Sequence, residues 1–130
     1  MLILILILIL VLVLIPTQTH ILTLRGSKEL TAKSRLTLFE GFMDRYLQSD
    51  AQAAVNGYCT LADEIGMSPS ELALAWCYSR DYVCSSIIGA TTLDQLKENM
   101  GAVLLKDKIT DEVCKSINSV HKKCMDPSKT

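Results

Sequence analysis

The sequence predicts an α/β fold: the C-terminal part of a (β/α)8 (TIM) barrel, mostly helical as it stands and incomplete as a barrel. One strand is clear, at Val83–Ile88, where β-branched and small apolar residues suit burial on both faces. Two helices are predicted before this strand and two after it. Because a parallel strand cannot form a sheet alone, the segment requires neighbouring strands on either side.

The chain divides by composition into an apolar, low-complexity segment at 1–24 and a segment of mixed composition at 25–130. No polar residue occurs in the run 1–15, MLILILILILVLVLI, which is shorter than the roughly 20 residues that span a bilayer. It lacks the basic start and the small-residue cleavage site of a secretory signal. Three interpretations remain: a membrane anchor or uncleaved signal, a buried element of the fold, or low-complexity sequence without a selected role. We favour the third.

Charge and cysteine usage exclude several classes of function. The formal net charge of −1 predicts no attraction to nucleic acid. An odd number of cysteines without a C-x-x-C pair predicts thiols in a reducing, cytoplasmic compartment, and neither a disulfide framework nor a metal site. The protein would be membrane-associated only if the run 1–15 acts as an anchor, and oligomeric state is unknown at this point. The cysteines are Cys59, Cys77, Cys84, Cys114 and Cys124.

Residues 25–50 are polar and lack a sustained helical or strand period, which predicts a long loop with a short strand or turn near 36–39. Its basic residues either face a phosphate or belong to a solvated loop, and the solvated loop is the simpler interpretation. These residues are Arg25, Lys28, Lys33 and Arg35.

Two helices are expected before the strand. Apolar residues recur every three or four positions over 50–65, with Asp50 as the expected N-cap and Gly66 as a left-handed terminator. Ser68-Pro69-Ser70-Glu71 then has the pattern of a capping box with proline in the first turn. The helix that it opens runs to Tyr78 and is apolar nearly all round, so Trp76 is expected in the core.

Two more helices are expected after the strand. The first runs from Leu93 to about Met100, and residues 104–109 connect it to the second. Thr110 is the expected N-cap of the last helix, whose acidic first turn and Lys122-Lys123 end complement the helix dipole. Val113, Ile117 and Val120 form its apolar face, and the tail 126–130 is expected to fray.

The candidate site is the turn between the strand and the helix at Leu93. Gly89 allows the backbone to approach a ligand closely or to adopt a positive φ. Thr92, with Gln95 three residues later, has the pattern of a capping box. A helix start after a strand presents N–H groups and a positive dipole end, which together suit an anion such as phosphate. Many turns of this kind bind nothing.

Several segments resemble the aldo-keto reductase family: IIGATT with QLKEN at 87–99, SPSELALAWCYSR at 68–80, and SRLTLFEGF at 34–42. The resemblance extends from Ser34 to the C-terminus. It implies an oxidoreductase that uses NADP(H) on a small carbonyl or alcohol substrate. Gly89 and Ala90 would shape the turn, and Thr91 and Gln95 would contact the adenosine 2′-phosphate. The implied cofactor-binding set is Gly89, Ala90, Thr91, Thr92, Gln95, Glu98 and Asn99, of which the last two would meet the adenine edge.

The resemblance also indicates what this chain does not supply. The family works with an Asp, Tyr, Lys and His set on earlier strands, and no residue here matches it, so no catalytic residue is predicted. His20 and His121 are the only histidines. The expected function is that of a C-terminal fragment of an NADPH-dependent aldo-keto reductase, inactive by itself. The alternative is a non-catalytic interaction remnant, tethered to a membrane through residues 1–15.

Overall fold

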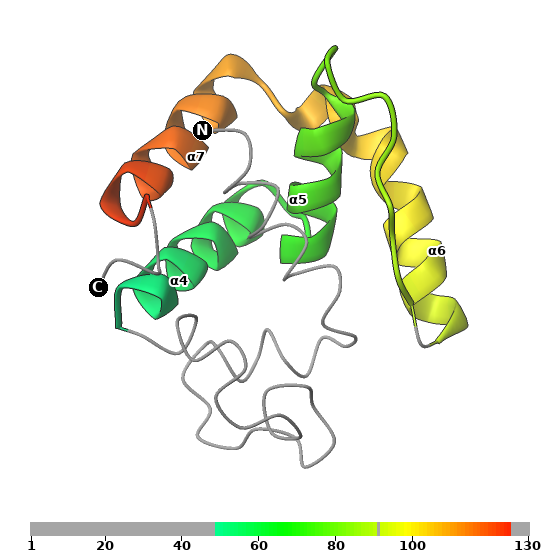
Figure 1. Ribbon diagram of the computed structural model, residues 1–130, viewed down its shortest axis with the longest axis horizontal. Coiled ribbons are helices and arrows are strands. Elements are labelled where there is room, and N and C mark those ends of the chain that lie inside the picture. The colour runs from blue at the N-terminus through cyan, green and yellow to red at the C-terminus, as the bar shows by residue number, and fades with distance from the viewer. Residues whose placement is uncertain (1–48, 91, 126–130) are drawn as a thin grey trace.

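In the computed structural model of the chain, residues 49–90 and 92–125 are described (Figure 1). None of the helices in these ranges is long and apolar enough to cross a membrane. The apolar run 1–15, residues 25–48 of the predicted loop with its four basic residues, Thr91 and the tail 126–130 lie outside them. Residues 49 and 50 belong to a helix and not to that loop. The helices are α4 (Ser49–Glu64), α5 (Pro69–Tyr78), α6 (Leu93–Gly101), the 3-10 helix η2 (Ala102–Lys108) and α7 (Asp111–Lys123).

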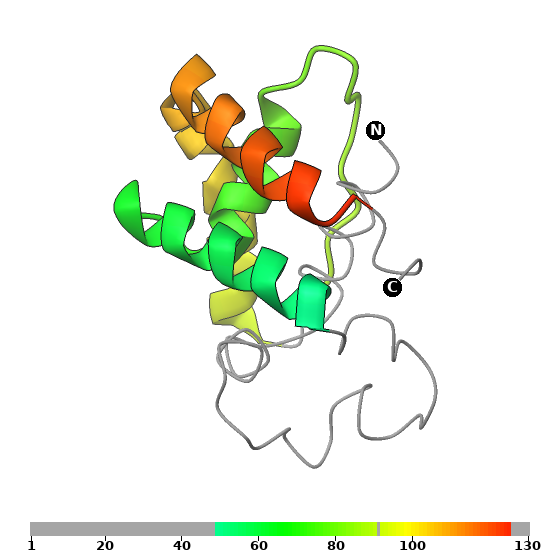
Figure 2. The ribbon, with the colours of Figure 1, turned by 90° about the vertical axis from the view of Figure 1, so that its left-hand side faces the viewer.

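Helix α5 lies between two layers of the molecule. On one side α7 runs antiparallel to α4, as Figures 1 and 2 both show. On the other side α6 and the segment 83–90 run side by side in opposite directions. The antiparallel pair approaches closely at Gly57, where an added Cβ would lie 3.1 Å from a γ-methyl of Val120. The missing side chain of Gly57 therefore lets α4 and α7 pack against each other.

The core forms where α4, α5 and α7 meet. Trp76 lies in it, as the sequence predicts, with 8% of its surface exposed. On α7, Val113 and Ile117 are buried, and His121 continues the same face. The main cluster consists of Leu61, Ala62, Met67, Leu72, Ala75, Trp76, Cys77, Ile109, Val113 and Ile117.

The helix boundaries follow the predicted caps. Ser68 and Glu71 form a complete capping box, and Pro69 occupies the first turn of α5. Gly66 has φ of +66°. The N–H of Met67 donates to the Ala62 carbonyl and that of Gly66 to the Asp63 carbonyl, which is a Schellman motif. Thr110 caps α7 through the Val113 N–H.

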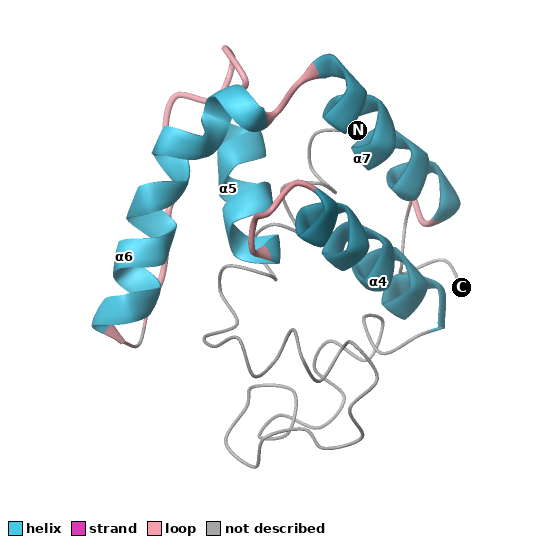
Figure 3. Cartoon of the chain, turned by 180° about the vertical axis from the view of Figure 1, so that it is seen from behind, coloured by secondary structure: helices cyan, strands magenta, loops and turns pink. Residues whose placement is uncertain are grey.

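Two predictions for local structure need correction. Asp50 is not the N-cap of α4 but lies inside its first turn, where its charge still complements the dipole. The strand at Val83–Ile88 does not form: the described residues comprise only helices and loops (Figure 3). The physical reason is the one given above, because a parallel strand exists only through hydrogen bonds to neighbouring strands.

The segment 83–90 nevertheless has two distinct sides. Ile88 packs on Leu74 and Ala102, and Ser86 interacts with the Cys77 thiol of α5. Between them, Ile87 is 85% exposed. This alternation is the period of two expected of a strand, with one side on the helices and the other uncovered.

Candidate functional site

Two local hydrogen bonds cap the start of α6. The Thr92 hydroxyl accepts from the Gln95 N–H at 3.3 Å, and the Thr92 N–H donates to the Gln95 side-chain oxygen at 3.3 Å. The predicted capping box is therefore present. It engages the carboxamide oxygen of Gln95 within the cap, and the cap fixes the direction in which α6 begins.

Among the described residues, two backbone N–H groups at the start of α6 have no acceptor, those of Leu93 and Asp94. The Gln95 N–H is used by the capping box, and the Leu96 N–H donates to the Thr92 carbonyl. The first N–H groups of a helix have no partner inside it, and adjacent ones converge on one anion. This pair can therefore receive a phosphate oxygen.

The charges around this helix start are mixed. Asp94 lies in the first turn, with 97% of its side chain exposed. Its carboxylate lies 3.9 Å from the ammonium group of Lys97, which is the basic residue of α6. Both groups are solvated, so their pairing contributes little stability. Asp94 opposes an incoming anion, and Lys97 partly offsets it.

Behind the turn, Asn99 holds Gly89 in place. The Asn99 carboxamide nitrogen donates to the Gly89 carbonyl at 3.1 Å, and Asn99 is only 7% exposed. Gly89 does not use the positive φ that glycine allows, since Gly66 is the only described glycine with one. A Cβ at Gly89 would meet no atom of the described residues within 4 Å. The described neighbours of Gly89 therefore leave room for a side chain at this position.

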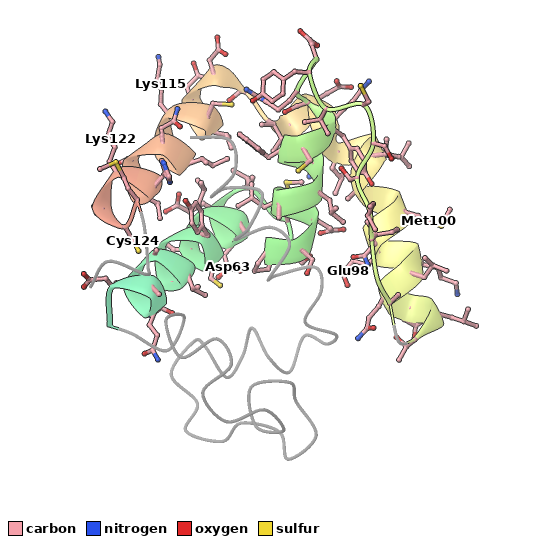
Figure 4. The ribbon with its side chains drawn as sticks, viewed as in Figure 1. Asp63, Glu98, Met100, Lys115, Lys122 and Cys124 are labelled. Atoms are coloured by element: carbon pink, nitrogen blue, oxygen red, sulfur yellow. The ribbon has the colours of Figure 1, made fainter. Side chains whose placement is uncertain are left out.

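Glu98 reaches from α6 to the start of α5 (Figure 4). There the Ser68 hydroxyl donates to Glu98 Oε1. The same hydroxyl accepts from the Glu71 N–H at 3.1 Å, so one side chain caps α5 and contacts α6. Nothing in the sequence pattern indicates this contact, because its partners are 30 positions apart.

The predicted site residues are thus partly brought together. Gly89, Thr92, Gln95, Glu98 and Asn99 surround one turn, each joined to a neighbour by a hydrogen bond. Ala90 is exposed beside them. Sequence reasoning missed Ser68 as part of this group, although it recognised the residue as a cap.

Other reactive side chains lie away from the turn. The Arg80 guanidinium lies 5.2 Å from the centre of the Trp76 ring and donates to the Cys114 sulfur at 3.2 Å. Burial raises the pKa of the Cys77 thiol, and a hydrogen bond from Ser86 lowers it by less. In the described ranges no two cysteines form a disulfide, and no three metal-ligating side chains cluster.

Residues 19–122 match the model of the Aldo/keto reductase family. The chain belongs to this family. The match starts upstream of Ser34, where the resemblance was expected to begin, and it includes every helix described above except the last residue of α7. The (β/α)8 barrel of an aldo/keto reductase thus explains a helical layer beside a segment that lacks its neighbouring strands.

The curated relatives agree with this assignment. The chain is 37% identical over 108 residues to a probable voltage-gated potassium channel subunit beta of Oryza sativa subsp. japonica, covering 81% of this chain and 33% of that protein. It is 38% identical over 98 residues to Protein tas of Escherichia coli, covering 75% and 27%. An Aldo-keto reductase of Babesia bovis is 37% identical over 98 residues, covering 75% and 34%. The chain spans about a third of the length of these relatives.

Proposed function

We propose that the turn at 89–92 and the first turn of α6 hold the adenosine 2′-phosphate end of NADP(H) in an aldo/keto reductase. The observation that carries this proposal is the pair of backbone N–H groups, on Leu93 and Asp94, left over by the capping box. The bound nicotinamide would exchange hydride with a small carbonyl or alcohol substrate. This chain would contribute the contacts to the 2′-phosphate and to the adenosine end of the cofactor.

We also propose that the 130-residue chain has no reductase activity by itself. The family's Asp, Tyr, Lys and His set has no match in the sequence. Tyr58 and His121 lie on α4 and α7, on the other side of α5 from the turn (Figure 1). Burial, and to a lesser extent the charge of Cys124, raise the pKa of Tyr58 to about 12. A raised pKa makes the phenol a weaker acid and therefore a poorer proton donor. NADPH oxidation by the pure chain with an aldehyde would contradict this proposal.

The binding proposal is tested with small probes that contain only the adenosine end. Adenosine 2′,5′-bisphosphate should bind more tightly than adenosine 3′,5′-bisphosphate or 5′-AMP in calorimetric titrations of the whole chain. In 15N-resolved NMR spectra, the amide signals of Leu93 and Asp94 should shift most. Equal binding of the three probes, or no binding, would overturn the proposal.

One substitution sharpens the test. Asp94→Asn removes the negative charge in the first turn of α6, so affinity for the 2′-phosphate should rise about two- to fivefold at low salt. Asp111→Asn makes the same change in the first turn of α7 and is the matched control. It should leave the affinity unchanged, because the field of a helix end falls off within one turn.

The second candidate function is protein association. Leu93 is 75% exposed, Met100 61% and Leu104 82%, and Figure 4 shows Met100 directed away from α5. Some relatives are named as potassium channel subunits, which suits association. The test is light scattering over a range of concentrations: association through this surface should be lost in Met100→Lys. Cytoplasmic location and the membrane tether at 1–15 stay predictions.

A further inference from the structure

We infer that Ser68 is a positioning residue for the base of the cofactor: it orients Glu98 to select adenine over a purine that lacks the amino group. This inference rests on the proposed function, because it concerns the same nucleotide. It concerns Ser68, the N-cap of α5, which is not among the cofactor-binding residues that the family resemblance implies.

The Ser68 hydroxyl both donates and accepts a hydrogen bond. A serine hydroxyl has one proton to donate, and here it is directed to Glu98 Oε1. One lone pair of its oxygen accepts from the Glu71 N–H at 3.1 Å, and the Ser68 N–H donates to Glu71 Oε2 at 2.8 Å. The hydroxyl is therefore held on both sides. Its proton cannot turn toward another acceptor without breaking the contact with Glu98.

The Glu98 carboxylate is held through one of its two oxygens. Glu98 is half-buried, and its side chain has rotatable bonds that would be disordered without a partner. The contact with Ser68 fixes Oε1, and Oε2 accepts no hydrogen bond from the described residues. Asn99, the next residue, is fixed by its bond to Gly89, which fixes the backbone from which Glu98 extends. Glu98 thus keeps one oriented acceptor oxygen next to the start of α5.

A carboxylate held in place can distinguish one purine base from another. An ionised carboxylate only accepts hydrogen bonds, so it pairs with an amino group and repels a carbonyl oxygen. Adenine carries an amino group where hypoxanthine carries a carbonyl. A site built around one polar contact rejects an analogue that cannot make it, provided that the polar group is held in place. Holding it in place is the role of Ser68.

The experiment compares NADP+ with its hypoxanthine analogue, using the whole chain and calorimetric or NMR titration. The wild-type chain should prefer NADP+ by about tenfold, as expected for one hydrogen bond to a charged group. Ser68→Asp keeps an N-cap for α5 but offers Glu98 a negative charge in place of a donor. It should reduce the preference to within about twofold.

Two further variants separate positioning from stability. Ser68→Thr keeps the hydroxyl and should keep the preference. Ser70→Ala, in the first turn of the same helix, is the matched control and should also keep it. Thermal unfolding of each variant gives its stability, which a purely structural role would change without changing the ratio of the two affinities.

The outcomes distinguish the two proposals. If wild-type binding does not depend on the 2′-phosphate, the proposed function fails and this inference fails with it. If binding depends on the 2′-phosphate but not on the base, or if Ser68→Asp keeps the preference, the inference alone is overturned. A preference lost in Ser68→Asp and kept in Ser68→Thr and Ser70→Ala supports it.

Discussion

Helices α5 and α6 have similar lengths and the same type of N-terminal cap, but they bury opposite kinds of residue. Six consecutive residues of α5, from Leu72 to Cys77, are buried. In α6 one residue is buried, and it is the polar Asn99. Leu93 and Met100 of α6 are mostly exposed. The two helices therefore have the same type of N-terminal cap, but α5 buries many more side chains than α6 does.

The difference shows what stabilises each layer. Helix α5 is covered by α4, α7 and η2, so apolar burial holds it in place. Helix α6 is fastened mainly by polar contacts, from Asn99 to Gly89 and from Glu98 to Ser68. An amphipathic helix held in this way keeps apolar side chains such as Leu93 and Met100 exposed. The predictions below test this contrast, from the largest effect to the smallest.

The largest effect is expected in the covered layer. Trp76→Ala removes a buried ring from the main core cluster together with its contact to Arg80, so stability should fall by about 3–5 kcal/mol. Leu93→Ala is the control on α6, where the side chain is 75% exposed and the change should be below about 0.5 kcal/mol. Urea unfolding followed by far-ultraviolet circular dichroism measures both. Similar losses would contradict the contrast between the helices.

The sequence predicted those features that depend on neighbours within four or five positions. Both capping boxes, the left-handed Gly66 and the cap at Thr110 are of this kind. The burial of Trp76 also followed, because a helix that is apolar all round must be covered on most sides. Each of these predictions relied on a short pattern with one physical reason.

The sequence could not predict contacts that the fold alone brings together. Ser68 and Glu98 meet across 30 positions, and the strand at 83–88 depends on chains of hydrogen bonds to other strands. One missed feature did have a signal. His121 lies four residues after Ile117 and eight after Val113, so the helical period placed it on the buried face. Residues near a chain end are easily assigned to the tail, although a helix can hold them in the core.

The second prediction concerns the polar fastening of α6. Asn99→Ala leaves the Gly89 carbonyl without its donor, which should cost about 1–3 kcal/mol. Because the contact is local, amide hydrogen exchange should accelerate in α6 and at 89–90 more than in α4 or α7. Asn118→Ala, at an exposed position of α7, is the matched control and should leave exchange unchanged. Uniform acceleration across all helices would show that Asn99 supports the whole fold instead.

The third prediction uses the pKa of Tyr58 in the covered layer. Burial, followed by the charge of Cys124, raises this pKa from 10.0 to about 12, so the folded chain favours the neutral phenol. The resulting stability is fully present below pH 10 and is lost as the pH rises toward 12. Since Tyr58 is only half-buried, the loss should be about 1–2 kcal/mol after allowance for screening. Denaturant unfolding between pH 9 and 12 measures it. Tyr58→Phe should flatten the profile, and an unchanged slope in that variant would reject this origin.

The smallest effect compares a glycine in each layer. Gly57 and Gly101 both lie in helices, so changing either to alanine gains up to about 1 kcal/mol of helix propensity. At Gly101 the new methyl group meets no described atom within 4 Å, and the gain should appear in full. At Gly57 it would lie 3.1 and 3.2 Å from the two γ-methyl groups of Val120, so crowding between α4 and α7 should cancel the gain.

Val120→Ala removes both methyl groups, and in that background Gly57→Ala should stabilise the chain as much as Gly101→Ala does. Thermal unfolding of the single and double variants measures these differences. If Gly57→Ala and Gly101→Ala give equal gains in the wild-type background, the close contact between α4 and α7 is not limiting and the two layers are packed with similar tolerance.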